Sequence, residues 1–357
     1  MPCRLTSFLL GWLIILSTSA HALNDGPGVV TRIVDVGHGL CAYSLIEIPS
    51  HPAGSVDDKY FVVLYDTGPD RSCGDSIKRH VSADLTEIDL LIISQNSDDH
   101  AGGLLYIANT FKINEFWYTG ADYDATENTD FIKALQLLHD AGTSIRSMYN
   151  APIQRGEFLK VTKDVKLIAL QGYHDTGNIH AGLNQERALK AGSIAIKLVV
   201  GKYGLLFPGD IQGRDLNDPE SSCKYSEQDL TTYQPNANLS SDVLIAPDHG
   251  SDHASSECFI RAVNPKYVIF PSGHLGENPS ATAYLRYRKA GVEVSNMYRT
   301  DRGDAEVLPL DGRSDWRQEG QGCHDLAGDD DVLVYLYPIV SPLVGYFDDG
   351  RFEACDK

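Results

Sequence analysis

The chain has 357 residues and a formal net charge of −19 at pH 7, and 42% of its residues are hydrophobic. This length is enough to bury the core of one large domain or of two small ones. The acidic charge disfavours nucleic acids and anionic membranes as partners, because both are bound through clustered Lys and Arg side chains and the sequence contains no basic stripe. A small-molecule substrate fits this charge better, and a protein partner stays open.

The first 22 residues predict a signal peptide. Arg4 precedes an apolar run over residues 8–16, and the small-x-small sequence Ala20-His21-Ala22 follows it. The run is about half as long as the ~20 residues that span a membrane, although an uncleaved anchor is the alternative. We expect cleavage after Ala22 and a secreted or periplasmic protein that has no membrane contact after cleavage. Cleavage removes Arg4 and no acidic residue, which leaves 335 residues (357 − 22) with a net charge of −20.

The cysteines agree with export. Six remain after cleavage: Cys41, Cys73, Cys223, Cys258, Cys323 and Cys355. An even number in an oxidising compartment predicts disulfides, but the spacing does not determine which residues pair. A bond between Cys323 and Cys355 would clasp the C-terminal tail. Cys41 follows a strand-like run and could instead be a buried free thiol.

Along the chain, short apolar and β-branched runs alternate with loops and two clear helices. The predicted strands are residues 29–36, 60–65, 88–94, 165–170, 193–200, 204–207, 242–246, 267–271, 292–295 and 332–337. One helix covers 131–138 with Thr129 as its cap, and Ser280 caps another over 281–289 that Gly291 ends. This order predicts a sheet-based α/β core. The polar stretches 212–241 and 311–331 indicate an insertion and the start of a C-terminal extension.

Acidic and histidine side chains follow four of the predicted strands. In chain order they are Asp99 and His100, Asp210, Asp248 and His249, and His274. Ligands gather just beyond the carboxyl ends of strands in such sheets, where loops present side chains on a rigid base. Taken singly, each of these residues is more often a solvated turn residue. Together they have the composition of a site for a hard-to-borderline divalent cation.

A series of motifs in the same order resembles the metallo-β-lactamase-fold hydrolases, and most of all the hydrolase domain of bacterial DNA-uptake (competence) channel proteins. The motifs are VDVGHG at 34–39, LYDTG at 64–68, IDLLIIS at 88–94, FPGD at 207–210, APDHGS at 246–251, SG at 272–273 and GENP at 276–279. The resemblance covers roughly residues 29–303. It implies a four-layer α/β/β/α sandwich with the site at one edge of two packed sheets. We therefore assign residues 1–22 to the signal peptide, 23–310 to the metallo-β-lactamase-like domain and 311–357 to a disulfide-clasped extension packed on it.

The departures from the family pattern fall on the metal ligands. The family motif is H-x-H-x-D-H, whereas residues 95–100 are QNSDDH. Gln95 and Ser97 thus replace both ligands of the first metal. The pair expected to hold the second metal, Asp99 and His100, is retained. Asp210, the expected bridging ligand, is also present.

Later motifs depart in the same way. His249 matches the second histidine of the family's H-H-G-S element, whereas Asp248 replaces the first, and Asn278 replaces the histidine of G-H-P. The resemblance also implies that Asp66 of the D-T-G element braces the site loops. His38 lies in a Gly-His-Gly turn that turn chemistry explains without a ligand.

The resemblance therefore implies one divalent ion, zinc or manganese, held by Asp99, His100, Asp210 and His249. Three protein ligands with an open position make a catalytic site, and four without water make a structural one. Asp99, Asp248 and His274 are the candidate catalytic residues for moving protons.

We expect an exported hydrolase of ester, phosphoester or amide bonds. The alternative is a non-catalytic periplasmic binding or assembly protein on the same fold. An exported nuclease is disfavoured by the charge, and the fold name alone does not indicate β-lactam hydrolysis.

Overall fold

The computed structural model of the chain describes residues 28–48, 59–120, 129–150, 154–172, 181–232, 238–273, 278–301 and 330–347. The predicted signal peptide, the candidate His274 and the proposed Cys323–Cys355 clasp lie outside these residues. None of the helices in the described ranges is long and apolar enough to cross a membrane.

The described residues form strands and short helices in alternation. The strands are β1 (Val29–Ile33), β2 (Ala42–Glu47), β3 (Tyr60–Tyr65), β4 (Glu87–Ile93), β5 (Lys112–Tyr118), β6 (Ser144–Ser147), β7 (Phe158–Lys160), β8 (Val165–Gln171), β9 (Ala195–Val200), β10 (Tyr203–Phe207), β11 (Val243–Ile245), β12 (Tyr267–Phe270), β13 (Met297–Arg299), β14 (Val332–Leu336) and β15 (Leu343–Tyr346). The α-helices are α3 (Ser72–His80), α4 (Asp98–Ala101), α5 (Leu104–Thr110), α6 (Thr129–Asp140), α7 (Gln185–Ala191), α8 (Tyr225–Thr232), α9 (Glu257–Val263) and α10 (Ala281–Lys289). Two 3₁₀ turns are η1 (Pro247–Gly250) and η2 (Val294–Asn296).

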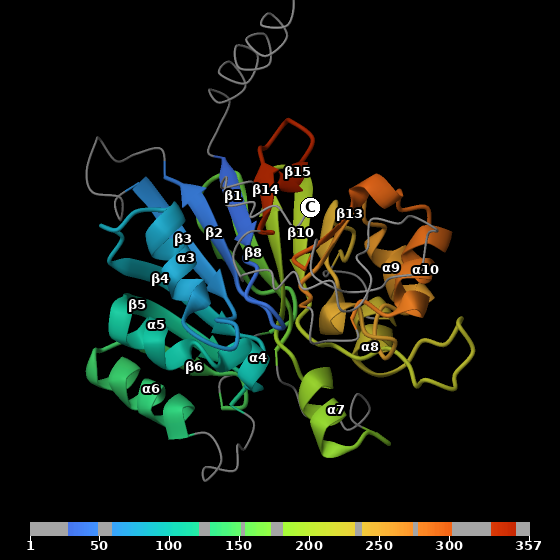
Figure 1. Cartoon of the computed structure of the whole chain (residues 1–357), viewed down its shortest axis with the longest axis horizontal. Coiled ribbons are helices and arrows are strands. Elements are labelled where there is room, and N and C mark those ends of the chain that lie inside the picture. The colour runs from blue at the N-terminus through green and yellow to red at the C-terminus, as the bar shows by residue number, and fades with distance from the viewer. Residues whose placement is uncertain are drawn as a thin grey trace, which may run out of the picture.

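The strands make two sheets in the described part of the chain. One sheet has the order β15-β14-β1-β2-β3-β4-β5-β6, and the other has the order β13-β12-β11-β10-β9-β8-β7. In each sheet one half is antiparallel, and the other half, β3 to β6 or β10 to β13, is parallel. Helices α3, α5 and α6 lie outside the first sheet, and α8, α9 and α10 lie outside the second (Figure 1).

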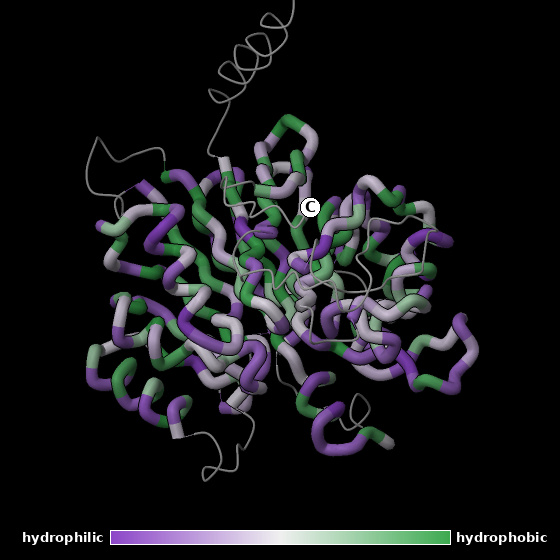
Figure 2. Tube along the Cα trace, viewed as in Figure 1, coloured by the Kyte–Doolittle hydropathy of each residue, from purple (hydrophilic) through white to green (hydrophobic). Residues whose placement is uncertain are grey.

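Strand β4 shows why the sheets pack into layers. Its side chains alternate, so Leu90 and Ile92 face the core between the two sheets, whereas Leu91 and Ile93 face the core under α3, α5 and α6. The run is therefore apolar throughout, as expected for a strand buried on both faces. A third core joins the second sheet to α8, α9 and α10. The hydrophobic strands lie at the centre of the molecule (Figure 2), and the predicted four-layer α/β/β/α sandwich is confirmed.

Most predicted elements are observed, with shifts of a few residues at their ends. Ser280 caps α10 as expected, because its Oγ accepts a hydrogen bond from the Ala283 backbone N–H at 3.1 Å. The strand predicted at 292–295 is wrong. A 3₁₀ turn, closed by Asn296 N–H donating to the Glu293 carbonyl at 2.9 Å, occupies this stretch, and the strand begins at Met297. Of the two valines in this stretch, Val294 belongs to the turn, and Val292 packs in the core beside α10.

The polar insertion is fixed to the sandwich by covalent and buried polar contacts. Cys223 in the insertion forms a disulfide with Cys258 of α9. Glu227 of α8 is fully buried and accepts hydrogen bonds from the backbone N–H groups of Ser255 and Ser256 at 2.6 and 2.8 Å. A second disulfide joins Cys41 to Cys73, so the alternative of a free Cys41 thiol is wrong.

The C-terminal strands are part of the first sheet, because β14 lies between β15 and β1. A buried ion pair holds this join: Arg32 Nη1 lies 2.5 Å from Asp331 Oδ2, with side-chain exposures of 7% and 0%. Asp331 Oδ1 also accepts the backbone N–H of Asp35 at 2.7 Å. The boundary expected at residue 310 falls outside the described residues.

Replacing Asp331 by alanine should leave the Arg32 guanidinium buried without its carboxylate. We expect Asp331→Ala to lower the free energy of unfolding by about 3–5 kcal/mol, measured by urea denaturation. The matched control is Asp130→Ala, which breaks an ion pair to Lys133 whose side chains are 63% and 62% exposed and should cost less than about 1 kcal/mol. Equal effects of the two substitutions would contradict a structural role for the buried pair.

Candidate metal centre

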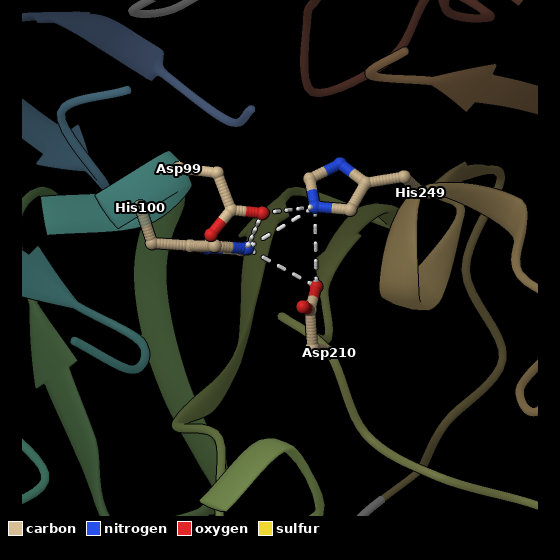
Figure 3. A group of neighbouring side chains, drawn as sticks. All are labelled: Asp99, His100, Asp210 and His249. Carbon is tan, nitrogen blue, oxygen red and sulfur yellow. Dashed lines mark hydrogen bonds and ion pairs between the residues drawn. The ribbon is translucent and has the colours of Figure 1, made fainter. Parts of the chain in front are cut away.

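Four side chains meet where the parallel halves of the two sheets end. Asp99 and His100 belong to α4, which follows β4 of the first sheet. Asp210 follows β10, and His249 lies in η1 after β11, both from the second sheet. The side chains converge from these different elements (Figure 3), as expected at the carboxyl ends of parallel strands.

The donor atoms of these residues are close enough to share one ion. His100 Nε2 and His249 Nε2 lie 3.2 Å apart. Asp210 Oδ1 lies 3.2 Å from His100 Nε2 and 3.6 Å from His249 Nε2. Asp99 Oδ2 lies 3.3 Å from His249 Nε2 and 3.8 Å from His100 Nε2. One donor atom from each residue lies within 4.8 Å of all the others.

These separations match the edges of a coordination tetrahedron. Zinc binds imidazole nitrogen and carboxylate oxygen at about 2.0–2.2 Å, so two ligands of a tetrahedral ion lie about 3.3–3.6 Å apart. The five distances above run from 3.2 to 3.8 Å. Five of the six ligand separations are therefore close to those of a four-coordinate ion, and the sixth, between Asp99 and Asp210, lies within 4.8 Å.

Hydrogen bonds at the Nδ1 atoms of His100 and His249 orient the two rings so that the Nε2 lone pairs point into the cluster. His249 Nδ1 lies 2.7 Å from the carbonyl oxygen of Pro271, and only an N–H can donate to a carbonyl. His100 Nδ1 lies 2.8 Å from Asp66 Oδ2, and that carboxylate also accepts the backbone N–H and the hydroxyl of Ser94, each at 2.7 Å. With both Nδ1 atoms donating, each neutral ring presents a bare Nε2, which is the usual arrangement of metal-binding histidines. Asp66 thus contacts the site as the resemblance implied.

The backbone at the site adopts conformations that non-glycine residues rarely take. Asp66, Asp248 and His249 have φ values of 58°, 49° and 55°, and each such conformation costs about 1–3 kcal/mol. Gly250 follows with a φ of 84°, and a Cβ there would lie 2.6 Å from the Phe270 ring. Strained residues of this kind concentrate at functional sites.

The electrostatic surroundings favour positive charge in the cluster. Burial lowers the pKa of His100, but the adjacent carboxylates, Asp210 above all, outweigh it and hold that pKa well above its usual value. Burial and Asp210 oppose each other in the same way at His249, whose pKa is also raised. Conversely, burial raises the pKa of Asp99 and Asp210, and the facing imidazoles bring both below their usual range. Protons and a metal ion therefore compete for the same place.

The opposite side of Asp210 is occupied by hydrogen-bond donors. Gln95 Nε2 donates to Asp210 Oδ2 at 2.5 Å, and Lys190 Nζ lies 3.4 Å from the same oxygen. Lys190 also donates to Asp248 Oδ1 at 2.7 Å, and Gln212 Nε2 donates to Asp248 Oδ2 at 3.0 Å. Asp248, a candidate proton carrier, thus has both oxygens engaged and lies outside the four-residue cluster.

Two side chains near the cluster were not predicted as site residues. His38 Nε2 lies 3.7 Å from Asp99 Oδ2 at the more open side of the site. Lys190 comes from α7 and had no signal in the sequence, because its local segment resembles any amphipathic helix end. Ser97, at the position of a lost family ligand, has a buried hydroxyl without a hydrogen-bond partner in the described residues.

Comparison with known proteins finds a relative by sequence and several similar solved structures. No protein-family model matches the chain. Competence protein ComA of Neisseria gonorrhoeae is 32% identical over 116 residues, which are 32% of this chain and 14% of that protein. The chain therefore matches only a small part of the length of this relative.

The solved structures that resemble the chain include a metallo hydrolase and a metallo-β-lactamase, each at low sequence identity. A metallo hydrolase from the archaeon Ignicoccus hospitalis has 12% identity and a TM-score of 0.41, over 76% of this chain and 95% of that one. Zinc-bound PqqB from Methylobacterium extorquens has 11% identity and a TM-score of 0.42, over 76% and 97%. A metallo-β-lactamase of Cronobacter sakazakii has 12% identity and a TM-score of 0.35, over 62% and 84%.

The raised pKa values of His100 and His249 predict that the stability of the metal-free protein depends on pH. A proton held between His100 and His249 stabilises the fold fully below the unfolded pKa of about 6.5, and this stabilisation is lost as the pH rises through the raised folded pKa. We therefore expect the free energy of unfolding in chelator to fall as the pH rises above about 6.5.

Urea denaturation at several pH values measures this effect. The His100→Gln variant should lose most of the dependence, because the carboxylates hold the pKa of His100 well above its usual value, whereas His139→Gln, at a side chain that is 78% exposed, should keep it. Added zinc should reverse the trend, because zinc binds the deprotonated rings. A stability in chelator that does not change across this range would contradict the shared proton.

Proposed function

We propose that this protein is an exported hydrolase that uses one divalent metal ion, held by Asp99, His100, Asp210 and His249. The observation that carries the proposal is the pair of imidazole Nε2 atoms 3.2 Å apart, with a carboxylate oxygen of Asp99 and another of Asp210 beside them. Two neutral imidazoles in this arrangement repel each other unless a cation lies between them. Two nitrogens and two oxygens at tetrahedral spacing favour zinc over manganese, which prefers oxygen ligands in an octahedron.

A bound ion of this kind supplies an acidic water and polarises a carbonyl or phosphoryl oxygen. The chain's own residues orient that chemistry: Asp66 and the Pro271 carbonyl hold the two imidazoles, and burial excludes bulk water from His100, Asp210 and His249. Asp99 differs from these three because its side chain is 20% exposed. It is therefore the predicted proton carrier best placed to contact a substrate or a water from solution.

The substrate class and the location are part of the proposal. A small ester, phosphoester or amide suits a chain with a net charge of −19, and a long nucleic acid does not. The disulfides Cys41–Cys73 and Cys223–Cys258 support an oxidising compartment, in agreement with the predicted signal peptide.

The closed geometry of the cluster favours one alternative. Four protein ligands at tetrahedral spacing complete the coordination of zinc and leave no position for water, as in structural sites. In that case the ion would stabilise a binding or assembly protein and would do no chemistry.

Metal analysis of protein purified without a histidine tag tests the proposal. We expect about one equivalent of zinc in the wild type and less than about 0.2 in Asp210→Ala, which removes a buried ligand and leaves the Lys190 ammonium without the carboxylate between it and the imidazoles. Asp130→Ala is the control, because this carboxylate pairs with Lys133 at the surface and its side chain is 62% exposed. A wild-type value below about 0.2 equivalents would end the one-metal proposal.

Cobalt substitution distinguishes a catalytic ion with a bound water from a structural ion with four protein ligands. If a water completes the coordination, the visible spectrum of the cobalt protein should change with pH as the water ionises, because a bound water titrates near pH ~7. In Asp99→Ala the ion would keep three protein ligands and should show this titration in either case. A wild-type spectrum that is constant with pH, beside a titrating Asp99→Ala, would favour the closed structural ion.

A further inference from the structure

We propose that the Lys190 ammonium is the second cation of this site and takes the position that a second metal ion would need beside Asp210. The functional centre is then one metal ion together with one ammonium. This inference rests on the one-metal function proposed above.

The carboxylate of Asp210 shows two cation-binding sides. Its Oδ1 lies 3.2 Å from His100 Nε2 and 3.6 Å from His249 Nε2, and so belongs to the four-residue cluster. Its Oδ2 lies 2.5 Å from Gln95 Nε2 and 3.4 Å from Lys190 Nζ. A carboxylate placed in this way bridges two positive charges, as in sites where two metal ions lie about 3.5–4 Å apart.

The positive charge of Lys190 stabilises two buried carboxylates. Asp210 and Asp248 have side-chain exposures of 2% and 4%, and a buried carboxylate without a counter-charge is strongly unfavourable. Lys190 pairs with both, at 3.4 and 2.7 Å. One ammonium therefore neutralises part of the charge of two buried acids.

The amide groups around this position are oriented to suit an ammonium. Gln95 and Gln212 point their side-chain NH₂ groups at the carboxylates of Asp210 and Asp248. Since a carboxylate only accepts hydrogen bonds, both amides must be donors here. A metal ion at this position would need both amides to turn their oxygen atoms toward it, which removal of the ammonium allows.

Helix α7 is fixed so that Lys190 reaches the site from its last turn. The Asn184 side chain caps the helix by accepting the Arg187 backbone N–H at 2.9 Å. The Arg187 guanidinium donates to Asp215 at 2.6 Å and to Gln212 at 2.9 Å, which ties α7 to the polar insertion. Lys190 is thus a positioning residue held by a preorganised helix.

Zinc stoichiometry of Lys190 variants, measured by native mass spectrometry at saturating zinc, tests the inference. Lys190→Met removes the charge and the donors while keeping a similar length, and Lys190→Gln removes the charge but keeps an NH₂ for Asp248. Lys190→Arg keeps the charge. Lys133→Met is the surface control, because the Lys133 side chain is 63% exposed. Where Lys190→Met does not fold, Lys190→Gln supplies the same comparison.

We expect about one equivalent of zinc in the wild type, Lys190→Arg and Lys133→Met, and about two in Lys190→Met and Lys190→Gln. Neutral variants that keep the wild-type stoichiometry would overturn the role of Lys190, whatever their stability. A wild type without zinc would end the one-metal function. In that case a gain of about one equivalent in the neutral variants would still support Lys190 as the occupant of a cation site, and no gain would overturn both proposals.

Discussion

The candidate centre depends on two imidazole nitrogens that face each other across 3.2 Å. His249 must donate its Nδ1 hydrogen to the Pro271 carbonyl, and His100 Nδ1 lies against the Asp66 carboxylate. Both Nε2 atoms then carry lone pairs, and only a positive charge between them makes the contact favourable. The carboxylates of Asp99 and Asp210 complete a negatively charged cage for that charge.

The sandwich explains how residues from distant parts of the chain reach this cage. Each sheet has a parallel half, and the carboxyl ends of β4, β10 and β11 open at the same edge. Tyr65 joins the sheets there, because its hydroxyl donates to the Ile194 carbonyl at 2.5 Å. The left-handed backbone conformations of Asp248 and His249 cost about 1–3 kcal/mol each, and a hydrogen bond from the Asp248 backbone N–H to the Gly209 carbonyl at 3.2 Å ties this turn to the end of β10.

Much of the fold and the four-residue cluster could be predicted from the sequence. Continuous apolar runs such as 88–94 indicate strands buried on both faces, and the Asp and His residues after them indicate a site at the strand ends. Strand β5 was missed because Lys112, Asn114 and Glu115 interrupt its apolar pattern. The pairing of Cys41 with Cys73 could not be chosen, since spacing alone does not fix a pairing.

The role of Lys190 beside Asp210 and Asp248 could not be predicted from the sequence, for a different reason. Gln95 and Asp248 stand where the resembled family motifs have metal ligands, and in the sequence this difference indicated only that a ligand is absent. The role of Lys190 depends on how α7 packs against the insertion through Arg187, and no local pattern encodes that contact. The Lys190 ammonium gives Gln95 and Asp248 a shared explanation. Asp248 accepts a hydrogen bond from the ammonium, and Gln95 donates one to Asp210, which lies beside it.

Anomalous X-ray diffraction at the zinc edge, on crystals of the wild-type protein supplied with zinc, tests the central claim most directly. We predict one anomalous peak between His100 and His249, at about 2.0–2.2 Å from both Nε2 atoms and from oxygens of Asp99 and Asp210. An anomalous map with no peak among these four residues, and the two imidazoles joined by a hydrogen bond, would contradict the claim.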